Sequence, residues 1–401
     1  MERVKKYITS YVKGKTPTAL FPSKEPDTLP YLSPDYLRGV AEPESYAKQD
    51  SKTVVVDDGE VIVLWDGSNA GEIFISKKGI LASTMMMLQF DETQLDKTYF
   101  GYSFQNLEYI LKGKTAGSGI PHADKGVVGK LEIFKPSIIE QTTIANILTK
   151  VDEAIESVKN SIAAAERLKK SLMQNLLTGR MRPNGTYRNE DEFYTDEKYG
   201  KVPNGWEVKK LKELSVIQRG KFGHRPRNDE RFYNGVYPFV QTSDVVNSVY
   251  YLRNATQSLN ELGKSVSRSF PANTIIITIA ANIGYVALTQ YDVYFPDSLI
   301  GINANEDVIS SQFLFLQLMQ YKNILDSQST ESAQKNINYS NLRPLHIAYP
   351  IDIDEQKNIV ELIRGVFMRI EQKQNKIFAL RQLKKSLMQN LLTGKARVKI
   401  S

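Results

Sequence analysis

The sequence predicts an α+β protein with two mixed α/β domains in a pseudo-twofold arrangement, joined by two long helices that form an antiparallel coiled coil. The first observation behind this prediction is a repeated peptide, Leu-Lys-Lys-Ser-Leu-Met-Gln-Asn-Leu-Leu-Thr-Gly, found unaltered at Leu168–Gly179 and Leu383–Gly394. The second is a helical periodicity before each copy, and the third is a set of short β-type segments before each helix. The copies lie too far apart for a solenoid, whose unit is about 20–50 residues, so a whole domain has been duplicated.

The long helices are predicted at 138–180 and 353–396. Apolar residues recur at alternating steps of four and three, the pattern of a coiled-coil seam, and the stripe reappears 215 residues later with one exception, Val158 against Lys373. A helix of about 40 residues is about 60 Å long and needs a partner for its apolar seam, which its own duplicate can supply. The predicted seam residues are Ile144, Leu148, Val151, Ile155, Ile162, Leu168 and Leu172 in the first helix, and Ile359, Ile363, Val366, Ile370, Ile377, Leu383 and Leu387 in the second.

Matching start and stop signals flank both helices. A proline precedes each start, at Pro136 and Pro350, and acidic residues with a glutamine follow in the first turn. Each helix is predicted to end at a Thr-Gly pair, where glycine supplies the left-handed residue that terminates a helix.

The globular regions 1–137 and 204–352 are predicted to be mixed α/β. Faint parallels between them survive: Pro30–Leu32 with Pro238–Val240, Asn69–Gly71 with Asn282–Gly284, and Gly14-Lys15 with Gly220-Lys221. The segment 181–203 is polar and rich in turn formers, which predicts a surface linker. Short strands are expected at 54–56, 60–65, 73–75, 238–240, 274–278 and 285–288.

Composition narrows the function. The chain of 401 residues has a net charge of +7 and a pI near 9.1, which favours polyanionic partners. It has no cysteine and three scattered histidines, so we expect no disulfide and no metal site. It has no apolar run long enough for a membrane helix and no signal peptide core, so a cytoplasmic protein is expected.

No catalytic set is evident in the sequence. Gly113–Thr115 and Gly14–Thr16 lack the upstream glycine of a phosphate-binding loop. Glu207-Val208-Lys209 resembles half of a nuclease metal site but has no Pro-Asp ahead of it. We therefore expect no catalytic residue and no cofactor.

The second domain carries the stronger binding signal, a loop rich in cations, amides and glycines. Arginine suits guanine, and asparagine or glutamine suits adenine, in the major groove of DNA. The alternatives are a solvated charged loop and, for Asn282, a turn residue before glycine. The candidates are Arg219, Lys221, His224, Arg225, Arg227, Asn228, Arg231, Gln241, Thr242, Ser243 and Asn282.

The first domain offers mostly lysines, which suit phosphates better than base edges. The candidates are Lys13, Lys15, Ser33, Asn69, Lys77, Lys78, Ser83, Thr84, and the segment 112–118 with Lys112 and Lys114.

At the repeat, and at Gly-Lys-Val-Pro-Asn-Gly-Trp (Gly200–Trp206), the chain resembles the specificity subunits of type I restriction-modification systems. The resemblance covers nearly the whole chain, including Glu140-Gln141 and Glu355-Gln356 at the helix starts. It implies two target recognition domains that each read one half of a bipartite site in double-stranded DNA, with the coiled coil setting the spacer. It also implies two methyltransferase subunits that carry S-adenosylmethionine and methylate adenine, and restriction subunits that use ATP. The chain itself would be non-catalytic and hold no cofactor.

One departure and two rival functions follow from the same residues. The first copy lacks the Pro-x-Gly-Trp lead of the second, so its first strand should be shorter and no DNA contact is expected before Lys13. A single-chain restriction enzyme would need methyltransferase and nuclease domains for which 401 residues leave no room. A coiled-coil scaffold with two adaptor domains would explain the helices but not the basic, amide-rich loops.

Overall fold

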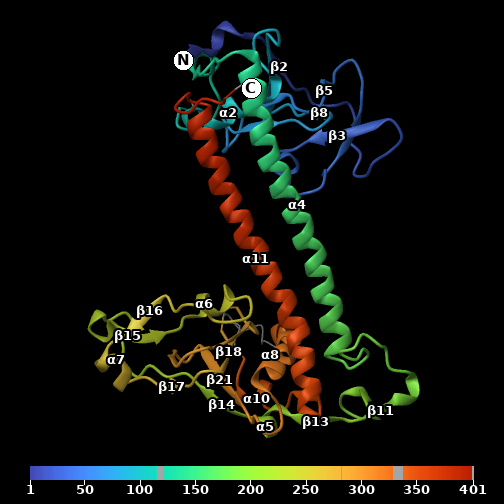
Figure 1. Cartoon of the computed structure of the whole chain (residues 1–401), viewed down its shortest axis with the longest axis vertical. Coiled ribbons are helices and arrows are strands. Elements are labelled where there is room, and N and C mark those ends of the chain that lie inside the picture. Colours follow the sequence, from blue (N-terminus) through green and yellow to red (C-terminus); the bar gives the residue numbers. More distant parts are fainter. Residues whose placement is uncertain (115–120, 281, 328–336, 400–401) are drawn as a thin grey trace. The chain divides into compact units, whose positions relative to one another are not determined.

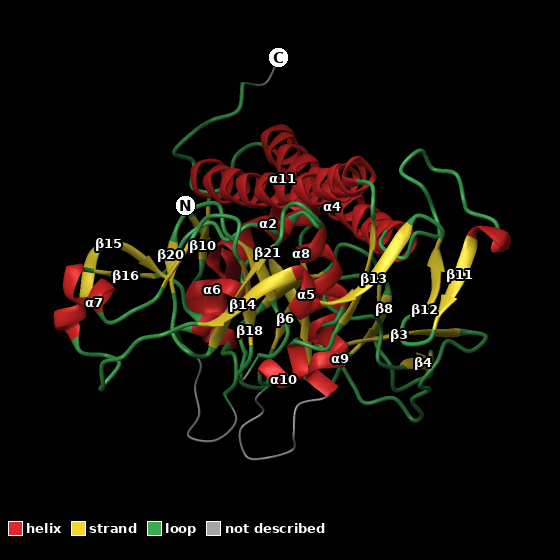
Figure 2. Ribbon diagram, turned by 90° about the horizontal axis from the view of Figure 1, so that it is seen from below, coloured by secondary structure: helices red, strands yellow, loops and turns green. Residues whose placement is uncertain are grey.

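The computed structural model describes residues 1–114, 121–280, 282–327 and 337–399. The chain forms two compact units. Unit 1 comprises Met1–Lys159 with Asn375–Ser401, and unit 2 comprises Asn160–Gln374. Figure 1 labels their elements and Figure 2 colours them by type. Within the described ranges, no helix combines the length and the apolarity needed to cross a bilayer.

The described part of unit 1 contains two four-stranded sheets, ordered β2-β9-β6-β7 and β4-β3-β8-β5, and the pair β1-β10. Helix α2 packs against β6 and β7. The strands are β1 (Glu2–Arg3), β2 (Ile8–Lys13), β3 (Thr28–Leu32), β4 (Tyr46–Lys48), β5 (Val55–Val56), β6 (Val61–Leu64), β7 (Ile73–Ile75), β8 (Gly79–Leu81), β9 (Met85–Phe90) and β10 (Glu132–Ile133). The short helices are η1 (Val4–Lys6), α1 (Pro34–Arg38), α2 (Lys97–Lys112) and α3 (Lys125–Lys130).

The described part of unit 2 repeats this plan, with sheets β14-β21-β18-β19 and β16-β15-β20-β17 and the pair β13-β22. Helix α8 packs against β19 and β21. The strands are β11 (Phe193–Asp196), β12 (Gly200–Pro203), β13 (Trp206–Lys210), β14 (Ser215–Arg219), β15 (Tyr233–Phe239), β16 (Gln257–Leu259), β17 (Ser269–Phe270), β18 (Ile275–Thr278), β19 (Val286–Leu288), β20 (Val293–Tyr294), β21 (Leu299–Ala304) and β22 (His346–Pro350). The short helices are η2 (Glu190–Glu192), α5 (Leu211–Leu214), η3 (Glu230–Phe232), α6 (Thr242–Val246), α7 (Glu261–Ser265), α8 (Ser311–Gln320), α9 (Lys322–Ser327) and α10 (Tyr339–Leu342).

The matching strand orders confirm the predicted duplication, and both units use one parallel pair at the same place, β3 with β8 and β15 with β20. The faint sequence parallels fall at equivalent positions. Gly71 and Gly284 both have positive φ, 89° and 80°, in the turns before β7 and β19. A Cβ on Gly71 would lie 2.8 Å from the backbone at the end of α2, and one on Gly284 would lie 3.0 Å from the backbone at the start of α9. Glycine is therefore required in both turns. As expected, β1 is shorter than its counterpart β13, at two residues against five.

The two long helices are α4 (Ile138–Leu176) and α11 (Ile353–Leu391), each of 39 residues. In unit 1, Ile144 and Leu148 near the start of α4 share a buried cluster with Leu391 at the end of α11. In unit 2, Leu176 at the end of α4 shares one with Ile359 near the start of α11. Each unit therefore pairs the start of one helix with the end of the other, which confirms the antiparallel arrangement.

Among the predicted seam residues, Leu168 and Leu383 are exposed, at 48% each, and the others are buried or partly buried. A helix of 3.6 residues per turn drifts about 20° per heptad from a 3.5-residue repeat, so the residues of one such stripe do not all face the same side over the whole helix. Buried seam residues are Ile144, Leu148, Ile155, Ile359, Ile363, Val366 and Ile370, and partly buried ones are Val151, Ile162, Leu172, Ile377 and Leu387.

The glutamine of the Glu-Gln pair at the start of each long helix has a structural role, which Gln141 on α4 shows. Gln141 is fully buried, and its Nε2 donates to the carbonyl oxygens of Pro136 (3.0 Å) and Gln94 (3.2 Å). Its Oε1 accepts a hydrogen bond from the backbone N–H of Asp96 (2.9 Å), the residue that caps α2. The side chain thus joins the start of the long helix to the start of α2.

Gln356 makes the same three contacts in unit 2. It donates to the carbonyl oxygens of Pro350 (2.8 Å) and Val308 (3.0 Å) and accepts from the N–H of Ser310 (2.9 Å), the cap of α8. Gln356→Leu should therefore lower the free energy of unfolding by about 3 kcal/mol, because each buried polar group left without a partner costs about 1–3 kcal/mol. Urea unfolding measures this, with exposed Gln372→Leu on the same helix as the control. Equal effects of the two substitutions would contradict this role.

The segment after each long helix binds the glutamate at the start of the other helix within the same unit. Gly179 and Gly394 have φ of 66° and 73°, as predicted for helix ends. In unit 1, the Arg397 guanidinium makes two hydrogen bonds to Glu140, of 2.8 and 2.7 Å. These bonds hold the pKa of Glu140 below its usual range.

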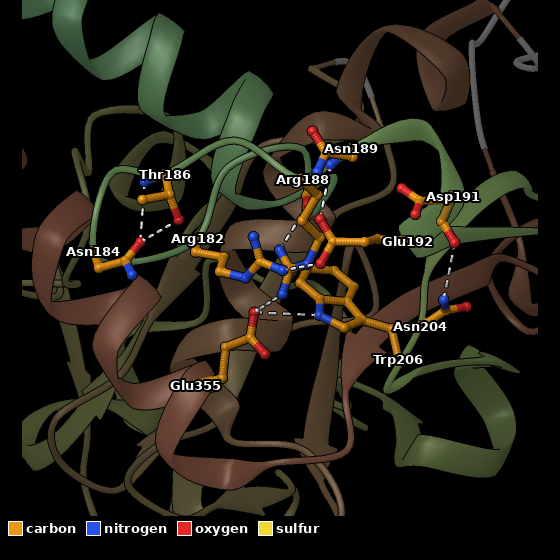
Figure 3. Close-up of polar contacts among 11 residues, drawn as sticks. Arg182, Asn184, Thr186, Arg188, Asn189, Asp191, Glu192, Asn204, Trp206 and Glu355 are labelled. Carbon is orange, nitrogen blue, oxygen red and sulfur yellow. Dashed lines mark hydrogen bonds and ion pairs between the residues drawn. The ribbon is translucent and has the colours of Figure 1, made fainter.

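In unit 2 the corresponding contact is made by Arg188, from the segment predicted to be a linker (Figure 3). Its Nη2 lies 2.7 Å from Oε1 of Glu355, and its Nη1 donates to the Gly179 carbonyl oxygen at 2.7 Å. Trp206 Nε1 donates to the same Glu355 oxygen at 3.3 Å. The side chain of Arg188 is only 7% exposed.

Most of the segment 181–203 is exposed or partly exposed, as expected of a surface segment, but it is more than a connecting linker. The segment contains the antiparallel hairpin β11–β12, and Val202 on it is fully buried. Its polarity resembled that of a solvated linker because the charges pair with one another and with the helix start, as Arg182 does with Glu192 (Figure 3).

Candidate nucleic-acid interface

Both units have a cation followed by a glycine at equivalent strand ends. β2 ends at Lys13 and β14 ends at Arg219, and Gly14 and Gly220 follow. A Cβ on Gly14 would lie 2.0 Å from a backbone carbonyl oxygen of the loop after β8, and one on Gly220 2.2 Å from one after β20. No larger residue fits at either position, so the parallel between the two Gly-Lys pairs has a steric cause. It places Lys13 and Arg219 at corresponding points of the two units.

Four arginines gather near Asp297 in unit 2, one at the end of β14, two in the loop that follows β14 and one just before β17. Arg219 Nε donates to the backbone oxygen of Asp297 at 2.5 Å, and Arg268 Nη1 donates to the Arg219 carbonyl oxygen at 2.7 Å. Arg227 pairs with the Asp297 carboxylate, and Arg225 Nη2 lies 3.6 Å from its Oδ2. The side chains of Arg225 and Arg227 remain 53% and 47% exposed, so an anion can reach them. We call Arg219, Arg225, Arg227 and Arg268 the arginine cluster.

The loop that carries this cluster rests on a small aromatic core. The His224 ring stacks on Phe232 with centroids 4.1 Å apart, and His224 Nε2 lies 2.9 Å from Oδ2 of Asp229. Arg231 also binds Asp229, and this hydrogen bond is the main reason why the pKa of Asp229 is well below its usual range. His224 and Arg231 therefore already have a partner that shapes the loop. The core consists of Phe222, Phe232, Phe239, Leu259 and Tyr294.

The other candidates of unit 2 lie in neighbouring turns. Gln241 Nε2 donates to Gln257 Oε1 at 2.8 Å, and the Thr242 hydroxyl lies 3.5 Å from that of Ser298. Asn282 lies in the turn between β18 and β19. This is the position expected if it is a turn residue before glycine. The exposed candidates are Lys221, Asn228, Ser243 and Asn282.

In unit 1 the corresponding cation, Lys13, belongs to a smaller cluster. Its Nζ lies 2.8 Å from Oδ2 of Asp66, while His122 Nδ1 lies 2.6 Å from Oδ1. Burial raises the pKa of Asp66, but the hydrogen bonds from Lys13 and His122 outweigh it, and the pKa falls below the usual range. The Asp66 carboxylate thus orients the cation at the strand end, whereas in unit 2 the strand-end Arg219 is held by the backbone oxygen of Asp297.

The remaining candidates of unit 1 divide into structural and surface residues. Ser33 caps α1 by accepting from the Tyr36 N–H at 3.3 Å, and the Lys77 ammonium lies 4.4 Å from the centroid of the Tyr36 ring. Lys112 pairs with Glu108 at 2.7 Å. Lys78 pairs with Asp57, and the backbone N–H of Ser83 donates to the Tyr31 hydroxyl. The backbone oxygens of Asn69 and Thr84 accept hydrogen bonds in turns. Lys15 and Lys114 are exposed, and residues 115–118 lie outside the described residues.

Sequence reasoning missed the residues that organise these clusters. Asp297 and Arg268 come from loops distant in sequence from Arg219, and only the strand order brings them together. Asp66 and His122 join in the same way, through a bridge outside the named strands. One signal in the sequence could have pointed to Asp297: it is an acidic residue that follows a proline at the end of the short apolar segment 293–295.

No group of three or more His, Cys, Asp or Glu residues that could hold a metal ion occurs among the residues that the structure describes. The acidic residues of both clusters instead have arginine, lysine or histidine neighbours. Such an arrangement suits anion binding through the exposed cations.

A second candidate surface lies on the repeated peptide. The lysine, serine and glutamine at its third, fourth and seventh positions are exposed in both copies, as is its first leucine. Its first lysine, at the second position, contacts a different residue in each unit: Lys384 pairs with Asp152 at 2.7 Å, whereas Lys169 lies 4.9 Å from the ring centroid of Phe367. The two copies therefore expose the same side chains, while the residues that they contact within each unit differ. We call Leu168, Lys170, Ser171 and Gln174, with Leu383, Lys385, Ser386 and Gln389, the repeated face.

Comparison with known proteins agrees with this architecture. The family model described as the type I restriction modification DNA specificity domain matches residues 7–167 and 203–381. The chain is 32% identical over 402 residues to the type I restriction enzyme MjaVIII specificity subunit of Methanocaldococcus jannaschii, covering 97% of this chain and 91% of that protein. It is 28% identical over 202 residues to the HindI specificity subunit of Haemophilus influenzae, covering 48% and 42%.

Solved structures support the same fold. The crystal structure of a type I restriction-modification S subunit from M. genitalium superposes with a TM-score of 0.65 at 14% identity, covering 100% of this chain and 96% of that one. The family match extends over both halves of the chain and the sequence relationship over nearly all of it. The chain therefore belongs to the type I restriction-modification DNA specificity family, as a specificity subunit rather than a catalytic one.

Proposed function

We propose that this chain recognises a bipartite site in double-stranded DNA, with the recognition domain of each unit reading one half and the paired helices setting the spacer. The observation that carries the proposal is the contrast between the units. They share their strand order and have a cation at the same strand end, Lys13 in unit 1 and Arg219 in unit 2. In unit 1 this cation shares the Asp66 carboxylate with His122, whereas in unit 2 it belongs to the arginine cluster around Asp297. Equivalent frameworks with different exposed groups suit two readers of different sequences.

Within unit 2, Arg225 and Arg227 are the candidates for base contacts, because a guanidinium can donate two hydrogen bonds to guanine. Lys221 and the lysines of unit 1 are proposed to bind phosphates, since an ammonium carries charge but no planar fork. Both groups are exposed enough to meet a duplex.

The repeated face supports the proposal of two identical partner subunits. Exposed helix residues tolerate substitution, so the fold does not require Lys170 and Lys385, or Gln174 and Gln389, to stay the same while the domains differ. A partner that binds both copies does require it. By resemblance to the family, these partners are two methyltransferase subunits, which would carry S-adenosylmethionine and methylate adenine, joined by restriction subunits that use ATP.

Salt-dependent DNA binding tests the recognition function against the scaffold alternative. We expect the logarithm of the association constant of the full chain for duplex DNA to fall linearly with the logarithm of salt concentration, because phosphate contacts release bound counterions. Fluorescence anisotropy at several salt concentrations measures the slope. A coiled-coil scaffold would show no DNA binding and no slope. Mapping modified adenines in cells that express the chain with its methyltransferase partner then identifies the site.

A further inference from the structure

Asp297 places a negative charge in the middle of the surface proposed to meet DNA. It follows β20 and contacts three cations: its backbone oxygen accepts from Arg219, and its carboxylate faces Arg225 and Arg227. The carboxylate side chain is 39% exposed. A negative charge there weakens the attraction to any phosphate, so non-specific DNA binding does not explain its presence.

The contacts of Arg225 show what the carboxylate does instead. Arg225 Nη1 donates to the carbonyl oxygens of Phe222 (2.6 Å) and His224 (2.8 Å), while Nη2 faces Asp297. The guanidinium is therefore held from two sides. Arg227 is held by the other carboxylate oxygen. An arginine fixed before binding loses less side-chain entropy on meeting a base, and it presents its donors in one direction only.

We propose that Asp297 is a positioning residue for sequence discrimination: it orients Arg225 and Arg227 towards base edges at the expense of overall affinity for DNA. This inference rests on the proposed function of unit 2 as the reader of one half-site. Removing the Asp297 charge should therefore weaken the preference for the correct half-site and strengthen binding to DNA of unrelated sequence. Loss of a residue needed only for stability would not produce these opposite effects.

The experiment is a binding selection from a random duplex DNA library, using the full chain, its Asp297→Asn variant and a matched Asp307→Asn variant. Asp307 is an exposed residue of unit 2 between β21 and α8 and provides the same change of charge away from the cluster. For Asp297→Asn we expect about a tenfold loss of preference at one half of the enriched site, the discrimination carried by one good arginine–base pair. The other half should be unchanged.

Binding of the variant to a scrambled duplex should strengthen by about twofold to threefold, because one nearby negative charge is gone. The slope of affinity against salt should stay the same, since no phosphate contact is added. In an Arg225→Gln, Arg227→Gln background, Asp297→Asn should cause no further loss of preference. Asp297→Glu, which keeps the charge, should retain more of the preference than Asp297→Asn.

Each other outcome is decisive. A wild-type chain that enriches no sequence refutes the proposed function, and this inference with it. A wild-type chain that enriches a bipartite site, alongside an Asp297→Asn variant that enriches it equally well, leaves the proposed function standing and overturns the inference. An undiminished effect of Asp297→Asn in the double-glutamine background also overturns it, because the residue would then act elsewhere.

Discussion

Replacing Arg188 by methionine should lower the free energy of unfolding of the chain by about 3 kcal/mol, because removing one partner of a buried ion pair leaves the other charge without compensation. Arg188 is 7% exposed and Glu355 is 20% exposed, so water replaces little of the lost contact. The substitution also removes the hydrogen bond to the Gly179 carbonyl oxygen at the end of α4. Methionine keeps most of the side-chain volume, so the loss reports the charge and its hydrogen bonds. Urea unfolding with the midpoint and slope fitted together measures it.

Arg182→Met is the matched control, since Arg182 comes from the same segment and also pairs with a glutamate, Glu192 (Figure 3). Both members of that pair are about one-third exposed, and exposed ion pairs contribute little to stability. We expect a much smaller effect. If Arg188→Met proved as mild as Arg182→Met, the segment 181–203 would act as the loose linker that its composition suggested.

The framework of the fold could be predicted from the sequence because its signals are local and occur twice. Periodicity located α4 and α11, and apolar segments located strands such as β6 and β18. The duplication then identified Gly14 with Gly220 without any structure. The exposure of Leu168 and Leu383 could not be anticipated, because the periodicity of one helix does not show which of its apolar residues meet neighbouring side chains.

The candidate interface was predictable only in part. The basic composition of the loop made Arg219, Arg225 and Arg227 candidates, and the structure brings these three side chains together around Asp297. Asp297 itself was not a candidate, because it lies some 70 residues away in the sequence and is brought close by the strand order β14-β21-β18 and the loop after β20. A carboxylate beside arginines has no sequence signature unless the pairing of strands is known.

Shortening both long helices by one heptad should shorten the spacer of the DNA site by about three base pairs, because seven residues span about 10.5 Å of helix and one base pair about 3.4 Å. Residues 157–163 and 372–378 are suitable segments, since they lie at equivalent positions of the two copies. Removing seven residues keeps the apolar seam in phase. The recognition domains and both glutamine anchors are untouched, so the two half-site sequences should stay the same. Removing the heptad from only one helix would put the seams out of register, and such a variant is expected to lose stability.

Two separate readers held at a distance set by the paired helices should bind a DNA site whose gap changes with helix length. Selection from a random duplex library with the wild-type chain and with the doubly shortened chain tests it most directly. Both proteins should enrich the same two half-sites, with the unspecified gap about three base pairs smaller for the shortened chain. An unchanged gap, or enrichment of one continuous sequence by the wild-type chain, would contradict it.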